Sequence, residues 1–235
     1  MGNALSRGAI CSLEGISGVG KSYLIQALRP ALADLPIVFL SEVVDRTGQD
    51  LDRDIIALLA KRGDRFFRSG KPLTETFLLL ALKMCDYEAR IAPALAQNQV
   101  VLEDRSLDTI AVYQALILHP DSLEHQLHAA REIYAIGARF RRPPDLTFLI
   151  EDDFSVALAR IEQREQKQLS QEETSVLQCA SLLYTRYAQD QTARFVRLPR
   201  PTLSLEQLIQ TIRARLLVLA NRQEPGGAIA ALSAD

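Results

Sequence analysis

Residues 9–22 have the sequence AICSLEGISGVGKS, in which an apolar run leads into a glycine-rich turn and a lysine. The stretch from Gly15 to Ser22 satisfies the pattern G-x-x-x-x-G-K-[ST]. The apolar run predicts a buried strand, and the leucines that follow the turn recur at helical spacing. This order directs backbone N–H groups and a helix N-terminus at a bound anion. The segment therefore predicts a phosphate-binding loop.

The residues of this loop have separate predicted roles toward a nucleotide. Lys21 is expected to bridge the β- and γ-phosphates, and the Ser22 hydroxyl is expected to ligate Mg²⁺, which neutralises charge on the transferred group. The other predicted phosphate-binding positions are Gly15, Ile16, Ser17, Gly18, Val19, Gly20 and Tyr23. The loop thus predicts a nucleoside triphosphate with Mg²⁺, without deciding the reaction.

Four further β-rich runs alternate with helical patterns along the chain. The runs cover residues 36–41, 100–102, 146–150 and 193–198. Helices are expected over 74–96, from a capping box at 121–124 to the residues before 141, and after capping boxes at Ser170 and Ser204. Strands that alternate with helices predict a parallel sheet covered on both faces. We therefore expect an α/β protein with the three-layer P-loop NTPase fold and a five-stranded parallel sheet, whose ligands bind at the carboxyl ends of the strands.

Length and composition bound the organisation of the chain. Its 235 residues fit one domain, because a single core usually grows to about 250 residues before it splits. We expect this domain over residues 1–222 and a flexible C-terminal tail over 223–235. The 27 Lys and Arg residues against 29 Asp and Glu argue against a nucleic-acid polymer as partner.

Two further features of the composition concern the cellular location. The longest apolar runs are far shorter than the roughly 18 residues that cross a bilayer, so no membrane partner is expected. The three cysteines are an odd number at no metal-ligand spacing. They predict free thiols in a reducing compartment, and hence a cytoplasmic protein.

A second polar motif, LEDRS over residues 102–106, follows the third apolar run. We expect its Asp104 and Arg105 at the carboxyl edge of the sheet, beside the loop. Asp104 is expected to hold Mg²⁺ or its water, and Arg105 to clamp an anionic acceptor with two N–H groups. None of the three asparagines precedes a lysine, so the guanine motif Asn-Lys-x-Asp is missing. The pattern favours ATP-dependent phosphoryl transfer over a switch GTPase.

Together these motifs resemble the thymidylate kinase family. The resemblance runs from Ile10 to about Leu198 and includes the loop, the segment 93–105 and the segment 144–149. The positions at which that family holds its acceptor nucleotide, after Asp-Arg, correspond to Thr109, Tyr113 and Gln114. The resemblance implies a kinase that uses ATP and Mg²⁺, a small-molecule phosphate acceptor, and a homodimer formed through the long helices.

Several acceptor positions depart from the family pattern. Ser17 stands where the family usually has a carboxylate that contacts the acceptor sugar. Leu79 and Lys83 stand where it has an aromatic residue that stacks on thymine and an arginine that reads the base. Since leucine cannot stack and lysine lacks the planar fork of arginine, we predict weak or relaxed selectivity for dTMP. Another monophosphate or a non-nucleotide phosphate is then expected to be the better acceptor. Glu42 and Arg46 are what remains of an Arg-Glu-Pro-Gly-Gly-Thr segment, and both are candidate acceptor contacts.

A helical lid is expected over about residues 160–172, because the preceding segment resembles the run into the family's lid. Arg160, Arg164 and Lys167 follow at i, i+4 and i+7, which predicts one cationic helical face. Position 18 is a glycine, so the phosphate-binding loop contains no arginine of its own. Arg160 and Arg164 are therefore candidate catalytic residues that stabilise charge on the transferred group. The alternative is a solvated helix whose arginines pair with neighbouring glutamates.

Three functions stay open at this point. The first is an ATP-dependent kinase of a nucleoside monophosphate of the dTMP type, or of a related small phosphorylated acceptor. The second is a deoxynucleoside kinase, whose family carries a motif like Asp104-Arg105-Ser106 and in which Glu42 would act as a base near a 5′-hydroxyl. The third is a nucleotide-binding regulator that has lost catalysis, against which the intact loop argues.

Overall fold

The computed structural model describes residues 8–42 and 51–221, and its centre is one parallel sheet. The five strands are β1 (Ala9–Glu14), β2 (Ile37–Leu40), β3 (Val100–Asp104), β4 (Leu146–Glu151) and β5 (Phe195–Pro199). Their order across the sheet is β2-β3-β1-β4-β5, and every pairing is parallel. The predicted α/β fold with a five-stranded parallel sheet is confirmed.

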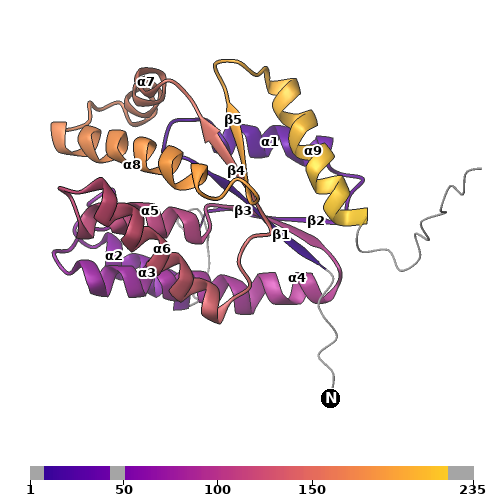
Figure 1. The fold of residues 1–235 in the computed structure, drawn as a ribbon, viewed down its shortest axis with the longest axis horizontal. Coiled ribbons are helices and arrows are strands. Elements are labelled where there is room, and N and C mark those ends of the chain that lie inside the picture. Colours follow the sequence, from indigo (N-terminus) through magenta and orange to yellow (C-terminus); the bar gives the residue numbers. More distant parts are fainter. Residues whose placement is uncertain (1–7, 43–50, 222–235) are drawn as a thin grey trace, which may run out of the picture.

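Helices lie on both sides of the sheet (Figure 1). On one side α1 (Lys21–Ala31) packs against α9 (Leu205–Asn221). The other side carries α2 (Leu51–Ala60), α3 (Pro72–Asp86), α4 (Ala92–Ala96), α5 (Leu107–Leu118) and α6 (Leu123–Phe140). The chain leaves β4 into α7 (Phe154–Glu165), and α8 (Gln171–Gln189) packs against α5 and α6. Along 8–42 and 51–221, no helix has the length and apolar character to span a bilayer.

The central strands are buried because both faces of the sheet are covered. Every residue of β1 and β3 is buried. Ile10 and Val101 pack with Ile91 and Leu95 at α4, on one face of the sheet. The register pairs Leu13 with Asp104, so the loop after β1 and the residues after β3 leave the sheet at the same edge. This edge is where parallel sheets bind ligands.

The helix predicted over 74–96 is nearly continuous but not uniform. It consists of α3, a π-helical turn over Tyr87–Ile91 and α4. The sequence patterns did not indicate α2 or α5. Helix α5 is buried on most of its surface, so its apolar residues do not form a single stripe with a helical period. The tail expected over 223–235 lies outside the described residues.

The predicted caps agree with the structure in two of three places. The capping boxes at Ser170 and Ser204 have both of their reciprocal hydrogen bonds. The box expected at 121–124 is wrong in its register, since Ser122 caps α6 and accepts a hydrogen bond from the backbone N–H of His125 at 3.3 Å. The extended backbone of Ser122 makes it the N-cap residue.

A buried ion pair ties the end of α6 to β3. Arg141 donates from Nη1 and Nη2 to the two carboxylate oxygens of Glu103, at 3.1 and 2.7 Å. Both side chains are almost completely buried. Ser106 Oγ also donates to this carboxylate, at 2.7 Å. Buried charges are tolerated when they are paired and hydrogen-bonded in this way.

Replacing Arg141 with Met should destabilise the protein by about 3 to 5 kcal/mol, because Glu103 would keep a buried charge without its partner. Arg131, whose pair with Asp190 is half-exposed, is the matched control. Arg131→Met should cost less than about 1 kcal/mol. Urea unfolding measures the free energy of unfolding of both variants. Equal losses of stability would contradict the argument that the Arg141 pair matters because it is buried.

Candidate active site

The phosphate-binding loop joins the end of β1 to the first residue of α1. Lys21 is buried, and its Nζ donates to the carbonyl oxygens of Gly15 and Ile16 at 3.0 Å each. Burial lowers the pKa of Lys21 to about 7. Ser22 and Tyr23 follow on the exposed first turn of α1. The lysine therefore lies inside the loop, where phosphate oxygens are the usual partners of this residue.

Helix α7 packs directly against the tip of this loop. Gly18 has a φ of 83°, and a Cβ there would lie 2.1 Å from the carbonyl oxygen of Ala157, so only glycine fits. Arg160 donates from Nη1 to the Gly18 carbonyl at 3.3 Å and pairs with Asp152 at 2.6 Å. The close contact brings Arg160 of the expected lid to the loop.

The cationic face expected on the lid is only partly present. Helix α7 ends at Glu165, and Gln166 has a left-handed backbone with a φ of 51°. Lys167 therefore lies beyond the helix, and its predicted place on the face of Arg160 is wrong. Arg164 is 63% exposed and pairs with Glu165 at 3.1 Å. The segment expected as a helical lid consists of the end of α7, a connection and the start of α8.

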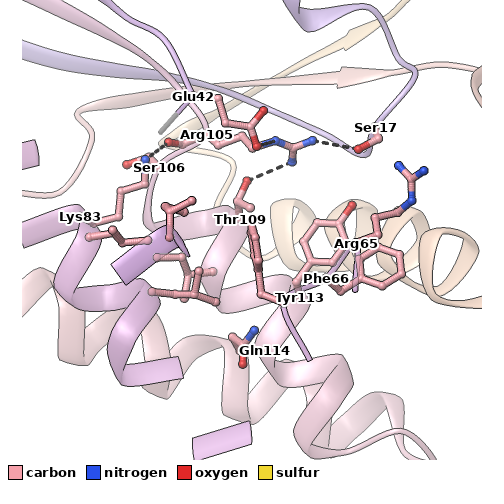
Figure 2. A pocket seen from close by; sticks show the side chains of 15 residues that line it. Ser17, Glu42, Arg65, Phe66, Lys83, Arg105, Ser106, Thr109, Tyr113 and Gln114 are labelled. Atoms are coloured by element: carbon pink, nitrogen blue, oxygen red, sulfur yellow. Dashed lines mark hydrogen bonds and ion pairs between the residues drawn. The ribbon is translucent and has the colours of Figure 1, made fainter. Parts of the chain in front are cut away.

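Arg105 lies at the centre of the site, directly after β3. Its buried guanidinium donates to the Gly15 carbonyl at 3.2 Å. It also donates to Ser17 Oγ at 3.3 Å and pairs with Glu42 at 2.9 Å (Figure 2). The φ of Arg105 is 63°, in the left-handed region that residues other than glycine rarely adopt. Strained backbone of this kind occurs preferentially at functional sites. Arg105 thus joins the loop, the end of β3 and the segment after β2.

Asp104, the last residue of β3, has a buried carboxylate oxygen that lacks a partner. Its Oδ1 makes no hydrogen bond to any of the residues that the structure describes. Burial raises the pKa of Asp104 and outweighs the opposing charges of Lys21 and Arg105. A carboxylate and the hydroxyl of Ser22 are oxygen ligands of the kind that Mg²⁺ prefers. These residues therefore fit the predicted metal ion.

A cavity of about 140 Å³ opens beside Arg105. The predicted residues that line it are Ser17, Glu42, Leu79, Lys83, Arg105, Thr109, Tyr113 and Gln114. Part of its wall is aromatic, since the rings of Phe66 and Tyr113 stack with their centroids 5.8 Å apart (Figure 2). Lys83 Nζ donates to the backbone carbonyl of Arg105 at 2.5 Å and lies 3.6 Å from Asp86. Arg46 is the one predicted acceptor residue outside the described residues.

Sequence reasoning missed the loop before α3, which supplies part of this cavity. Phe66 is buried in its wall, and Arg65 lines the cavity while it pairs with two glutamates of α7 and α8. Two adjacent aromatic residues, Phe66 and Phe67, in a polar stretch are the signal that could have found it. Leu79 does lie at the cavity, but the aromatic surface comes from another element.

Comparison with known proteins agrees with this geometry. A sequence profile of the thymidylate kinase family matches residues 13–212. The chain belongs to the thymidylate kinase family. A probable thymidylate kinase of Methanospirillum hungatei is 31% identical over 191 residues, which cover 80% of this chain and 84% of that protein. The thymidylate kinase of Pseudomonas fluorescens is 29% identical over 220 residues, which cover 91% of this chain and 98% of that protein.

A solved thymidylate kinase has the same fold. The crystal structure of the enzyme from Ehrlichia chaffeensis superimposes with a TM-score of 0.61 and 18% sequence identity. The match covers 90% of this chain and 98% of the other. The family fold therefore extends over nearly the whole chain.

A buried carboxylate lies beneath the site of this thymidylate kinase family member. Glu14 accepts hydrogen bonds from the backbone N–H of Ser106 at 2.6 Å, from Thr109 Oγ1 at 2.5 Å and from the Tyr184 hydroxyl at 3.0 Å. Burial, followed by the charge of Asp108, raises the pKa of Glu14 to about 7. Glu14 thus connects β1 with α5 and α8 directly below the loop.

The buried Glu14 should make the protein less stable as the pH rises toward neutrality. Its folded pKa of about 7 lies above the ordinary value of 4.5, so its contribution is full below pH 4.5 and is lost as the pH rises through 7. Relative to Glu14→Gln, the free energy of unfolding should fall by about 2 to 3 kcal/mol between roughly pH 5 and pH 8. Urea unfolding of both variants measures this difference, and a difference that does not change with pH would contradict it.

Proposed function

We propose that this protein transfers the γ-phosphoryl group of ATP to a nucleoside monophosphate of the thymidylate type. The observation that carries the proposal is the position of Arg105, which contacts the phosphate-binding loop and lines the acceptor cavity. Phosphoryl transfer depends mainly on alignment and on positive charge between the two phosphates. The relatives named thymidylate kinases support the same reaction.

On the donor side, Lys21 and the N–H groups of the loop would bind the phosphates of ATP. Lys21 would then exchange its two carbonyl partners for phosphate oxygens. Asp104, with its unpartnered oxygen, and Ser22 would hold Mg²⁺. When bound, Mg²⁺ neutralises negative charge on the phosphates.

The two lid arginines differ in their readiness for catalysis. Arg160 already lies at the Gly18 carbonyl, so it would need only to leave Asp152 and turn toward the transferred group. Arg164 would first have to leave Glu165 and enter the site from solvent. We therefore propose Arg160 as the main catalytic arginine of the lid, with Arg164 as a second that is recruited when the lid closes.

At the acceptor end, Arg105 would bind the monophosphate through N–H groups that now contact the loop. Its ion pair with Glu42 orients the guanidinium, and Thr109 lies 3.5 Å from the same group. A planar guanidinium can hold a phosphate through two parallel hydrogen bonds. The phosphate of the acceptor is thereby directed toward the loop.

The base of the acceptor would lie against the stacked rings of Phe66 and Tyr113. Gln114 supplies an amide at the same cavity. Lys83 is engaged with a backbone carbonyl and a carboxylate, so it does not present the base with a planar fork. The cavity would therefore recognise the base mainly by its flat shape, which agrees with relaxed selectivity.

The deoxynucleoside kinase alternative needs Glu42 as a general base. Burial pushes the pKa of Glu42 upward, but the charges of Arg105, Lys21 and Lys83 outweigh it and hold the pKa below its ordinary value. An efficient general base has a pKa near the working pH. Glu42 is better suited to orient Arg105, which favours the monophosphate as acceptor.

An acceptor panel tests the proposed function. The protein with ATP and Mg²⁺ should phosphorylate dTMP and use dUMP with only a several-fold lower kcat/KM, because the thymine methyl adds about 0.8 kcal/mol of burial. Thymidine should not be used. Lys21→Ala is the control, and its turnover should fall by at least about 10²-fold with every acceptor. Turnover of thymidine alone would favour the nucleoside kinase, and no turnover with any acceptor would favour the regulator.

We also propose that the protein is a cytoplasmic homodimer that uses α3 and α6. These helices pack against each other, and each exposes two large apolar side chains one turn apart. The residues are Leu73 and Phe77 on α3, and Ile136 and Phe140 on α6. Their exposure ranges from 40% to 70%, which is unfavourable unless a partner covers them.

The cysteines Cys11, Cys85 and Cys179 form no disulfide, which supports a reducing compartment.

The dimer is tested by placing a charge on this face. Phe77→Glu should convert the dimer into a monomer, because a carboxylate would be buried without a partner at the interface. Val218, which is half-exposed on α9 at the opposite side of the sheet, is the control position, and Val218→Glu should remain dimeric. Sedimentation equilibrium measures both masses, and a dimeric Phe77→Glu would exclude this interface.

A further inference from the structure

Arg200, in the turn after β5, contacts the phosphate-binding loop from outside. Its Nη1 donates to the carbonyl oxygen of Val19 at 2.8 Å. The side chain is largely buried, with 22% of its surface exposed. The guanidinium also occupies the space beside Gly20, where a Cβ would lie 1.9 Å from Nη1. A larger residue at position 20 would displace the guanidinium from this place, and the φ of 91° itself favours glycine.

The contact with Val19 has a direct consequence for phosphate binding. The carbonyl of Val19 and the N–H of Gly20 belong to one planar peptide group, in which they point in opposite directions. A donor that holds the Val19 carbonyl therefore fixes the Gly20 N–H in the direction away from Arg200. Inward N–H groups are what a loop of this type uses to hold phosphate oxygens.

Asp152, the residue after β4, lies between Arg200 and Arg160 and attracts the Arg200 guanidinium by its charge. Its carboxylate lies 3.9 Å from Nε of Arg200 and 2.6 Å from Nη1 of Arg160. Asp152 is itself 7% exposed. Arg160 donates to the Gly18 carbonyl, so the two arginines hold two successive peptide groups of the loop. Asp152 thus also pairs with the arginine proposed for catalysis, whereas nothing in the proposed reaction requires Arg200, and no motif in the sequence indicated either residue.

We propose that Arg200 is a positioning residue of the donor site, which Asp152 orients and which holds the peptide between Val19 and Gly20 ready for the phosphates of the nucleotide. This inference rests on the proposed function in taking ATP as the donor. N–H donors that already point at the phosphates bind their negative charge, in the ground state and in the transition state, better than donors that must first rotate into place. Loss of Arg200 should therefore weaken binding at the loop and leave the acceptor cavity unaffected.

The test compares Arg200→Ala with a matched control on β5, the strand that precedes Arg200. Arg197 is three residues earlier, pairs with Glu151 at the surface and does not contact the loop, so Arg197→Ala removes the same charge. Titration calorimetry with ATP and Mg²⁺, and separately with tripolyphosphate, measures affinity for the loop. Arg200→Ala should weaken both by about tenfold or more, as for loss of a charge-assisted hydrogen bond, while Arg197→Ala binds like the unaltered protein. Asp152→Asn should shift affinity in the same direction by a smaller factor.

Steady-state kinetics separates positioning from simple stabilisation of the fold. The KM for ATP should rise in Arg200→Ala while the KM for the acceptor stays constant, and Arg200→Lys should recover part of the loss because lysine also donates to the Val19 carbonyl. The proposal is overturned if Arg200→Ala lowers the melting temperature but, when folded, binds ATP and tripolyphosphate as tightly as Arg197→Ala. If the unaltered protein binds tripolyphosphate in an Arg200-dependent way but does not use ATP, the proposed function fails and the positioning role stands. If it binds neither, both fail.

Discussion

The buried guanidinium of Arg105 keeps the parts of the active site in one arrangement. A buried charge is stable only when it is paired and its N–H groups are bonded. Arg105 meets this condition through Glu42 after β2, through the Gly15 carbonyl and through Ser17 in the loop. These partners come from different parts of the chain, and together they pair the charge and the N–H groups of the Arg105 guanidinium. The loop and the acceptor cavity are therefore held at a fixed relation to each other.

A related constraint shapes the phosphate-binding loop itself. A loop that turns its N–H groups toward a ligand must provide other donors for its carbonyl groups, because buried carbonyls are rarely left unpaired. Lys21, Arg160 and Arg200 donate to these carbonyls from α1, from α7 and from the turn after β5. Since the donors are basic side chains, they satisfy the backbone carbonyls and also favour the binding of a negatively charged polyphosphate. Packing and electrostatics thus favour the same loop conformation.

The side chains that line the proposed acceptor cavity differ from those that the family resemblance implies. Leu79 and Lys83 remove the aromatic face and the guanidinium that the family resemblance leads one to expect on α3. Phe66, from the loop before α3, instead joins Tyr113 to form an aromatic wall. A flat apolar surface is available to a base from either element, because stacking requires a ring and not a particular backbone position. Lys83, in contrast, cannot replace the paired hydrogen bonds that an arginine at this position would donate to the base.

The sequence by itself determined the sheet, the phosphate-binding loop and the positions of Lys21, Ser22 and Arg105. These features depend on local patterns: apolar runs, glycine spacing and residues that directly follow a strand. The place of Lys167 was wrong because one left-handed residue ended α7, and periodicity carries no signal for such a residue.

Only the tertiary structure decided that Phe66 lines the acceptor cavity and that Arg200 reaches the loop. Both residues lie in connections without a repeating pattern, where the path of the chain is set by packing. The hydrogen bond from Arg200 spans 181 residues to Val19. A contact over that distance exists because the parallel sheet places the ends of β1, β4 and β5 at one edge, and it is visible only when the strands are assembled.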